Sequence, residues 1–254
     1  MEKVILILVD GMRPDGFAQC GNPFGKELLA RSAYDIGART VFPPVTLPCH
    51  MSLFHSVPPD RHGIVTNLYT PQVRPIPGLC EQLRAAGRNT AFFYSWEELR
   101  DLCRPDGLCF SYFVNMHAKA RADDLLTDAA VAYLRKESPD FTFLYLGETD
   151  EAGHRHGWMG KEYLACINNA ISCVERVFRN LPEDTTLILT ADHGGHGRSH
   201  GEEVSEDMTI PVLFSGKSFA PGKIEGVNIL DIAPTVAKLL GTNPVKEWEG
   251  RSVL

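Results

Sequence analysis

The sequence has no pair of cysteines spaced as Cys-x-x-Cys and no apolar run long enough to cross a bilayer. Its seven cysteines are scattered and odd in number, which argues against a disulfide scaffold. The apolar run at residues 4–9 is too short for an export signal or a membrane helix. From these features we expect a cytoplasmic protein with reduced thiols and no membrane partner.

Positive charge is also scarce: 25 lysines and arginines face 32 aspartates and glutamates, and the net charge is −7. A general nucleic-acid binder needs a basic face, so no nucleic acid polymer is expected as a partner. The 44% hydrophobic content is ordinary for a globular protein. Its length and the lack of repeats favour a single catalytic domain over residues 1–254, with a small cap within residues 66–121.

Segments typical of strands and of helices alternate along the chain. Short apolar runs, as expected of strands buried on both faces, end at Asp10, Tyr94, Leu146, Leu189 and Phe214. Helical patterns lie between them at residues 26–36, 78–87, 122–136, 160–180 and 229–240, with glycines in helix-terminating positions at Gly37, Gly87 and Gly241. This alternation predicts an α/β fold, with a mostly parallel central sheet and helices on both faces.

Three aspartates follow three of the expected strands. Asp10 comes directly after the first apolar run, Asp150 follows the run at 141–146 after three residues, and Asp192 follows the run at 187–191. In an open parallel sheet, ligands gather at the carboxyl ends of the strands. Three carboxylates meeting there would repel one another unless cations were bound between them.

Histidines accompany two of these aspartates. Asp150 and His154 are spaced i, i+4, which places both on one face of a helical turn. His193 directly follows Asp192, and the glycine-rich stretch after it holds two more histidines, His196 and His200. Imidazole and carboxylate ligands together suit zinc, with manganese or iron as alternatives.

Each of these features has an ordinary structural explanation when taken alone. An aspartate after a strand is often only a helix cap, the Asp-x-x-x-His spacing is common, and a loop of glycine and histidine can simply be exposed. Three such features at three strand ends favour a metal site over coincidence.

Five motifs occur in an order that is specific in combination: VDGMRPD at 9–15, FPPVTLPCH at 42–50, PDRHGI at 59–64 followed by Asn67, DEAGHRHG at 150–157 and TADHG at 190–194. With these motifs, and with DIAPT at 231–235, the chain resembles the alkaline phosphatase superfamily, in particular its type I phosphodiesterase/nucleotide pyrophosphatase branch. The resemblance implies a three-layer alkaline phosphatase-like sandwich.

The resemblance also implies a set of site residues. Two divalent metal ions, with zinc expected first, would be held by two ligand sets: Asp10, Asp192, His193 and the Thr46 hydroxyl for one ion, and Asp150, His154 and His200 for the other. Asn67 corresponds to the position whose amide donates a hydrogen bond to a phosphate oxygen. The implied reaction is hydrolysis of a small phosphodiester or an alkyl or aryl phosphate through a phospho-threonine intermediate.

Elementary chemistry agrees with this assignment. A threonine hydroxyl is a poor nucleophile and needs activation, which metal coordination supplies. Three aspartates and one alkoxide carry four negative charges, which two divalent ions neutralise. Thr46 taken alone, among prolines, would be interpreted as a buried or capping residue.

The sequence departs from the family pattern at two positions. No histidine follows His200, whereas nucleotide pyrophosphatases usually have their last metal-binding histidine far downstream. Either His200 or His196 must therefore complete the second set, and the similarity to shorter superfamily members favours His200. Cys49 stands where the family commonly has asparagine, and we expect it to be structural.

Two alternative functions remain at this point. A phosphomonoesterase or a phosphonate hydrolase could use the same metal core, although Asn67 and the partly apolar stretch at 64–79 favour diesters or alkyl phosphates. A non-catalytic metal-binding module would also fit the ligands, but the intact nucleophile at Thr46 argues against it.

Overall fold

An eight-stranded sheet forms the centre of the computed structural model, which describes residues 2–104 and 106–254. The strand order is β4-β3-β5-β1-β6-β7-β2-β8. The strands are β1 (Lys3–Val9), β2 (Ala33–Arg39), β3 (Thr90–Tyr94), β4 (Phe110–Phe113), β5 (Phe141–Leu146), β6 (Thr185–Thr190), β7 (Thr209–Ser215) and β8 (Gly222–Lys223). Most neighbours are parallel, but β7 runs antiparallel to both β6 and β2. The predicted mostly parallel sheet is confirmed.

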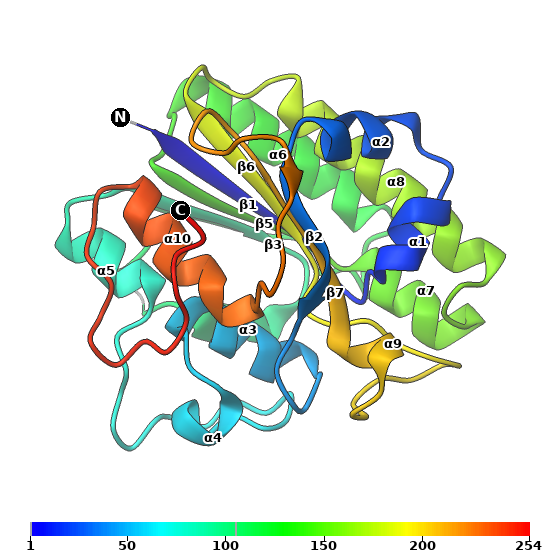
Figure 1. The fold of residues 1–254 in the computed structure, drawn as a ribbon, viewed down its shortest axis with the longest axis horizontal. Helices are drawn as coiled ribbons and strands as arrows, with labels where there is room; N and C mark the ends of the chain where they lie inside the picture. The colour runs from blue at the N-terminus through cyan, green and yellow to red at the C-terminus, as the bar shows by residue number, and fades with distance from the viewer. Residues whose placement is uncertain (1, 105) are drawn as a thin grey trace.

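Helices cover both faces of this sheet (Figure 1). On one face lie α3 (Thr46–His55), α5 (Leu79–Ala85) and α10 (Ile232–Leu239). On the other lie α1 (Pro14–Gln19), α2 (Pro23–Ala30), α6 (Ala122–Lys136), α7 (Glu148–His156) and α8 (Lys161–Phe178). The remaining short elements are α4 (Pro59–His62), η1 (Glu97–Leu102), α9 (Ser205–Met208) and η2 (Ile229–Asp231). The predicted three-layer arrangement is therefore confirmed.

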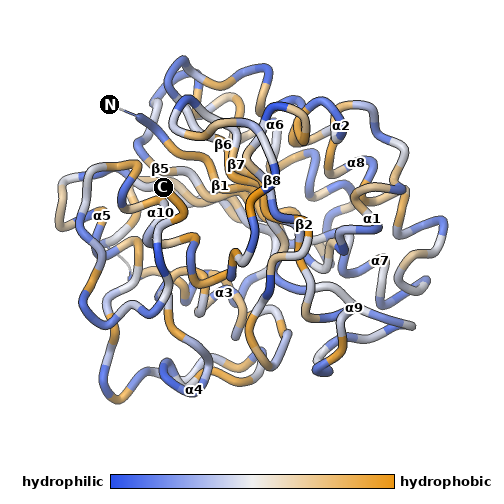
Figure 2. Tube along the Cα trace, in the orientation of Figure 1, coloured by the Kyte–Doolittle hydropathy of each residue, from blue (hydrophilic) through white to orange (hydrophobic). Residues whose placement is uncertain are grey.

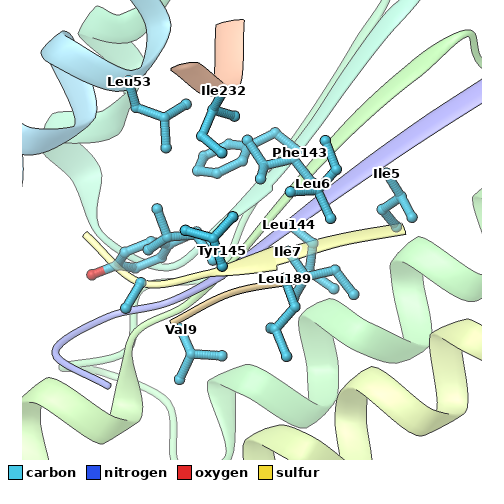
Figure 3. Close-up of a cluster of buried hydrophobic side chains, with 14 of the residues drawn as sticks. Ile5, Leu6, Ile7, Val9, Leu53, Phe143, Leu144, Tyr145, Leu189 and Ile232 are labelled. Atoms are coloured by element: carbon cyan, nitrogen blue, oxygen red, sulfur yellow. The ribbon is translucent and has the colours of Figure 1, made fainter. Parts of the chain in front are cut away.

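The central strand β1 explains why the layers hold together. It pairs in parallel with β5 on one side and with β6 on the other, and every residue from Val4 to Val9 is at most 2% exposed. A strand covered on both faces needs apolar residues at every position. Figure 2 shows the hydrophobic residues concentrated on these central strands, and Figure 3 shows β1 and β5 side chains packed together in the core.

One predicted helix is wrong in its second half. The helical pattern at 26–36 covers the end of α2, which stops at Ala30, and the start of β2, which begins at Ala33. Gly37 lies within β2 instead of at a helix end. Pairing of β2 with β7 overrides the local helical pattern, because tertiary contacts outweigh intrinsic propensity. Gly87 and Gly241 do follow α5 and α10, with φ of +71° and +66°, as predicted for helix ends.

Residues 66–121 contribute to the central sheet as well as to its surroundings. Both β3 and β4 belong to this stretch, and β3 pairs with β5.

Among the described residues, none of the helices combines the length and the hydropathy of a membrane span.

Candidate metal centre and nucleophile

The three aspartates follow three adjacent strands of the sheet. Asp10 follows β1 in the middle, Asp192 follows β6 on one side, and Asp150 lies in the first turn of α7, which follows β5 on the other side. The structure brings their carboxylates together with three histidines in two groups, in each of which the candidate ligand atoms lie within 4.8 Å of one another.

The inner group, as we call Asp10, Asp192 and His193, is almost fully buried, with exposures of 2%, 0% and 0%. His193 Nε2 lies 3.4 Å from Asp10 Oδ1 and 3.3 Å from Asp192 Oδ2. Thr46, the first residue of α3, places its Oγ1 3.2 Å from the same nitrogen. The predicted nucleophile therefore lies at the inner group.

The outer group, as we call Asp150, His154 and His200, is more open. His154 Nε2 lies 3.3 Å from Asp150 Oδ2, and His200 Nε2 lies 3.8 Å from Asp150 Oδ1. The His154 side chain is 42% exposed, whereas that of His200 is 9% exposed. The His193 and His200 rings stack with centroids 3.8 Å apart, so the inner and outer groups are in direct contact through these two rings.

All three histidines are oriented in the same way. In each, Nδ1 lies within hydrogen-bonding distance of a backbone carbonyl: 2.7 Å from His193 to Gly194, 3.0 Å from His154 to Arg198 and 2.8 Å from His200 to Pro44. Since a carbonyl can only accept, Nδ1 must carry the proton, and a neutral ring then presents the Nε2 lone pair to the group. Metal-binding histidines are typically held in this way.

One oxygen of each aspartate is buried without a hydrogen-bond donor among the described residues: Asp10 Oδ1, Asp150 Oδ1 and Asp192 Oδ2. Buried polar atoms are rarely left unpaired, because the loss costs about 1–3 kcal/mol each. Three such oxygens and three Nε2 atoms form a donor set that fits two divalent ions of the zinc, manganese or iron type.

The two groups differ in their electrostatics. Burial, followed by the charges of Asp192 and Asp150, raises the pKa of Asp10 well above its usual value. Burial alone would also raise the pKa of Asp150, but a hydrogen bond from His154 and the nearby imidazoles lower it. The same hydrogen bond raises the pKa of His154 to about 9. Without a cation, the outer group is thus an ion pair, whereas the inner group disfavours ionisation.

Asn67 lies beside the nucleophile. Its Oδ1 accepts a hydrogen bond from the backbone N–H of Leu47, at 2.9 Å, and Leu47 directly follows Thr46 in α3. This bond occupies the acceptor of the amide and leaves its Nδ2 as the donor. The geometry is compatible with the predicted contact to a phosphate oxygen.

Of the two candidate histidines, only His200 lies in the outer group. His196 Nδ1 lies 2.7 Å from Asp207 Oδ1, and the other oxygen of Asp207 accepts from the Glu202 backbone at 2.9 Å. His196 thus stabilises the loop that carries His200.

Cys49 is buried and receives a hydrogen bond from Thr40 at 3.2 Å.

Sequence reasoning did not select one residue that contacts the inner group. Tyr145 lies in β5 and its hydroxyl donates to Asp10 Oδ2. The available signal was a tyrosine inside an otherwise apolar strand, because a buried tyrosine hydroxyl needs a partner. His50 is also buried beside the inner group, with Nδ1 2.8 Å from the carbonyl of Thr46 and 3.6 Å from Asp192 Oδ2.

Several solved structures have a similar fold. The structure of human ectonucleotide pyrophosphatase/phosphodiesterase 5 matches 96% of this chain and 96% of its own, with a TM-score of 0.82 and 14% identity. A phosphonate monoester hydrolase from Silicibacter pomeroyi covers 100% of this chain over 76% of its own, with a TM-score of 0.79 and 15% identity. The chain therefore shares the fold of these two proteins.

The chain belongs to the type I phosphodiesterase / nucleotide pyrophosphatase family, whose model matches residues 4–81 and 81–205. This confirms the resemblance found in the motifs. Human ectonucleotide pyrophosphatase/phosphodiesterase family member 7 is 26% identical over 223 residues, which is 76% of this chain and 47% of that protein. The chain thus spans about half the length of this relative.

Proposed function

We propose that the protein hydrolyses small phosphate esters at a two-metal site, with Thr46 as the nucleophile. The observation that carries the proposal is the position of Thr46 Oγ1, 3.2 Å from the inner-group His193. Beside it, three aspartates each have one buried oxygen that no group of the described residues pairs with. Family membership supports a phosphoesterase.

The reaction would take two steps. In the first, a bond forms between Thr46 Oγ and phosphorus while the bond from phosphorus to the leaving-group oxygen breaks, and an alcohol departs. In the second, a water oxygen bonds to phosphorus while the bond to Thr46 Oγ breaks. The sum consumes one ester and one water and yields one alcohol and one phosphate product.

The residues of the two groups and Asn67 would have different roles in this reaction. The inner group would position Thr46 Oγ, and the more exposed outer group would face the incoming ester. Asn67, held by Leu47, would donate from Nδ2 to a phosphate oxygen as charge develops there. Two divalent ions, when bound, would neutralise the carboxylates and stabilise the attacking and leaving oxygens.

The surroundings of the nucleophile favour diesters or alkyl and aryl phosphates as substrates. Residues 40–60 and 62–73, which carry Thr46 and Asn67, hold no lysine or arginine. Three large apolar side chains in or beside these segments are exposed instead: Phe42 by 55%, Val65 by 53% and Leu68 by 75%. A substrate with several negative charges would find little compensation there, whereas an apolar ester group would find contacts.

The alternative is a phosphomonoesterase or a phosphonate hydrolase on the same residues, and the phosphonate monoester hydrolase with the same fold makes the second a specific candidate. The test is hydrolysis of p-nitrophenyl phosphate, bis-p-nitrophenyl phosphate and p-nitrophenyl phenylphosphonate by metal-stripped protein with zinc or manganese restored. We expect metal-dependent turnover that is fastest on the diester. Preference for the monoester or the phosphonate would select the alternative, and bound metal without any turnover would contradict hydrolysis of simple esters.

A further inference from the structure

Tyr145 connects the apolar core to the inner group. In the parallel pairing of β1 with β5, Tyr145 lies opposite Leu8. Side chains alternate between the two faces of a strand, so Asp10, two residues after Leu8, emerges on the same face as Tyr145. Figure 3 shows the Tyr145 ring within the apolar cluster and its oxygen pointing away from that cluster.

The Tyr145 hydroxyl makes the two oxygens of Asp10 different. It donates to Asp10 Oδ2, while Asp10 Oδ1 has no donor among the described residues and lies 3.4 Å from His193 Nε2. The Tyr145 side chain has little freedom to move, because it is 1% exposed and its ring packs edge-on against the His50 ring at 5.5 Å.

Within residues 2–104 and 106–254, Asp150 of the outer group has no comparable hydrogen bond from a tyrosine. Its two oxygens face histidines of the same group, Oδ2 toward His154 at 3.3 Å and Oδ1 toward His200 at 3.8 Å. The inner group is therefore the one whose carboxylate is oriented from outside the group by a tyrosine.

We propose that Tyr145 is a positioning residue for the inner metal ion: by holding Asp10 Oδ2, it turns Oδ1 toward the ion. The inference rests on the metal site of the proposed function. Hydrogen bonds to metal-binding carboxylates restrict their rotation, and their loss typically weakens metal binding or activity by about 10–100-fold. Replacing tyrosine by phenylalanine would leave Asp10 Oδ2 buried without a donor.

The test is zinc binding by Tyr145→Phe, measured by competition with a chromophoric chelator. To isolate the inner ion, the same change is made in a His200→Ala background, in which only the inner group keeps all its ligands. The expected result is about 10–100-fold weaker binding of that ion, together with a shifted visible spectrum of the cobalt-substituted inner site. Binding of the outer ion to the single variant should stay unchanged.

Tyr94→Phe is the matched control. Tyr94 ends the neighbouring strand β3 and is 8% exposed, and its hydroxyl makes no hydrogen bond within the described residues. This variant should bind both ions like the wild type.

Wild-type affinity and an unchanged cobalt spectrum in Tyr145→Phe would overturn the inference. Equal weakening of both ions would also overturn it, since that result would indicate general loosening of the core. A wild-type protein that binds no ion would contradict the proposed function itself, and the inference with it. Binding of both ions without turnover would contradict only the proposed reaction.

Discussion

The inner and outer groups use the same types of side chain in different settings. The inner group consists of residues within three positions of the ends of β1 and β6, no more than 2% exposed. The outer group takes Asp150 and His154 from α7 and His200 from the loop between β6 and α9, and the His154 side chain is 42% exposed. Under the proposed function, this difference would divide the roles: the buried inner group would hold the nucleophile in place, whereas the more exposed outer group would leave room for a substrate.

The largest expected effect concerns the link between Thr46 and the inner group. Thr46→Ala removes the attacking oxygen but leaves all six histidine and aspartate ligands in place. We expect turnover to fall by roughly a thousandfold or more, with metal content near that of the wild type. Thr46→Ser, which keeps the oxygen, should retain most of the activity. Turnover by Thr46→Ala at the wild-type rate would show that Thr46 is not the nucleophile.

Asn67 should have the next largest effect. Asn67→Ala removes the donor at Nδ2 and the acceptor that holds the Leu47 N–H, so we expect kcat/KM to fall by about 100-fold while both ions remain bound. Asn67→Asp keeps an acceptor for Leu47 but no amide donor, and should be as slow. Steady-state kinetics with metal analysis tests this. Near-wild-type activity in the aspartate variant would show that Asn67 only caps α3.

Stability measurements on metal-free protein compare the two groups directly. His193→Ala opens a buried cavity beneath the stacked His200 ring, and we expect it to cost about 2–3 kcal/mol in unfolding free energy. His154→Ala removes a half-exposed ring and a partly solvated ion pair, which should cost less than about 1 kcal/mol. Urea unfolding of both variants gives the values. Equal costs would mean that the inner group is no better packed than the outer one.

The smallest expected effect is a pH dependence of the outer group. In metal-free protein the pKa of His154 is raised to about 9 from its ordinary 6.5, so the folded state holds this proton more tightly than the unfolded state does. The resulting stability is fully present below pH 6.5 and is lost as the pH rises to about 9. Burial lowers the pKa of His200 to about 4, so in the folded state that residue does not titrate in this window.

Urea unfolding between pH 6.5 and 9 tests this for the wild type and for His154→Gln. The raised pKa of Asp10 is a feature of both proteins, so the difference in slope reports His154. A smaller loss of stability in the variant is expected, and identical slopes would contradict the Asp150–His154 ion pair. Bound zinc should remove the His154 contribution, because a ligating imidazole is already neutral.

Features set by local pattern could be predicted from the sequence. The apolar run of β1 and the i, i+4 spacing of Asp150 and His154 depend on neighbouring residues alone, and both appear in the structure. The second half of the helix predicted at 26–36 could not be foreseen as β2, because its strand conformation depends on pairing with the distant β7.

The sequence by itself determined the fold class, the family and which aspartates follow the strands. Apolar runs and the order of motifs can be recognised from the linear order of residues, without knowledge of tertiary contacts. Only the tertiary structure decided which side chains meet. It turned His196 toward Asp207 and His200 toward Asp150, placed Asn67 on Leu47, and brought Tyr145 to Asp10 across 135 positions. These contacts arise from sheet register and loop packing, which join residues far apart in sequence and leave no local pattern.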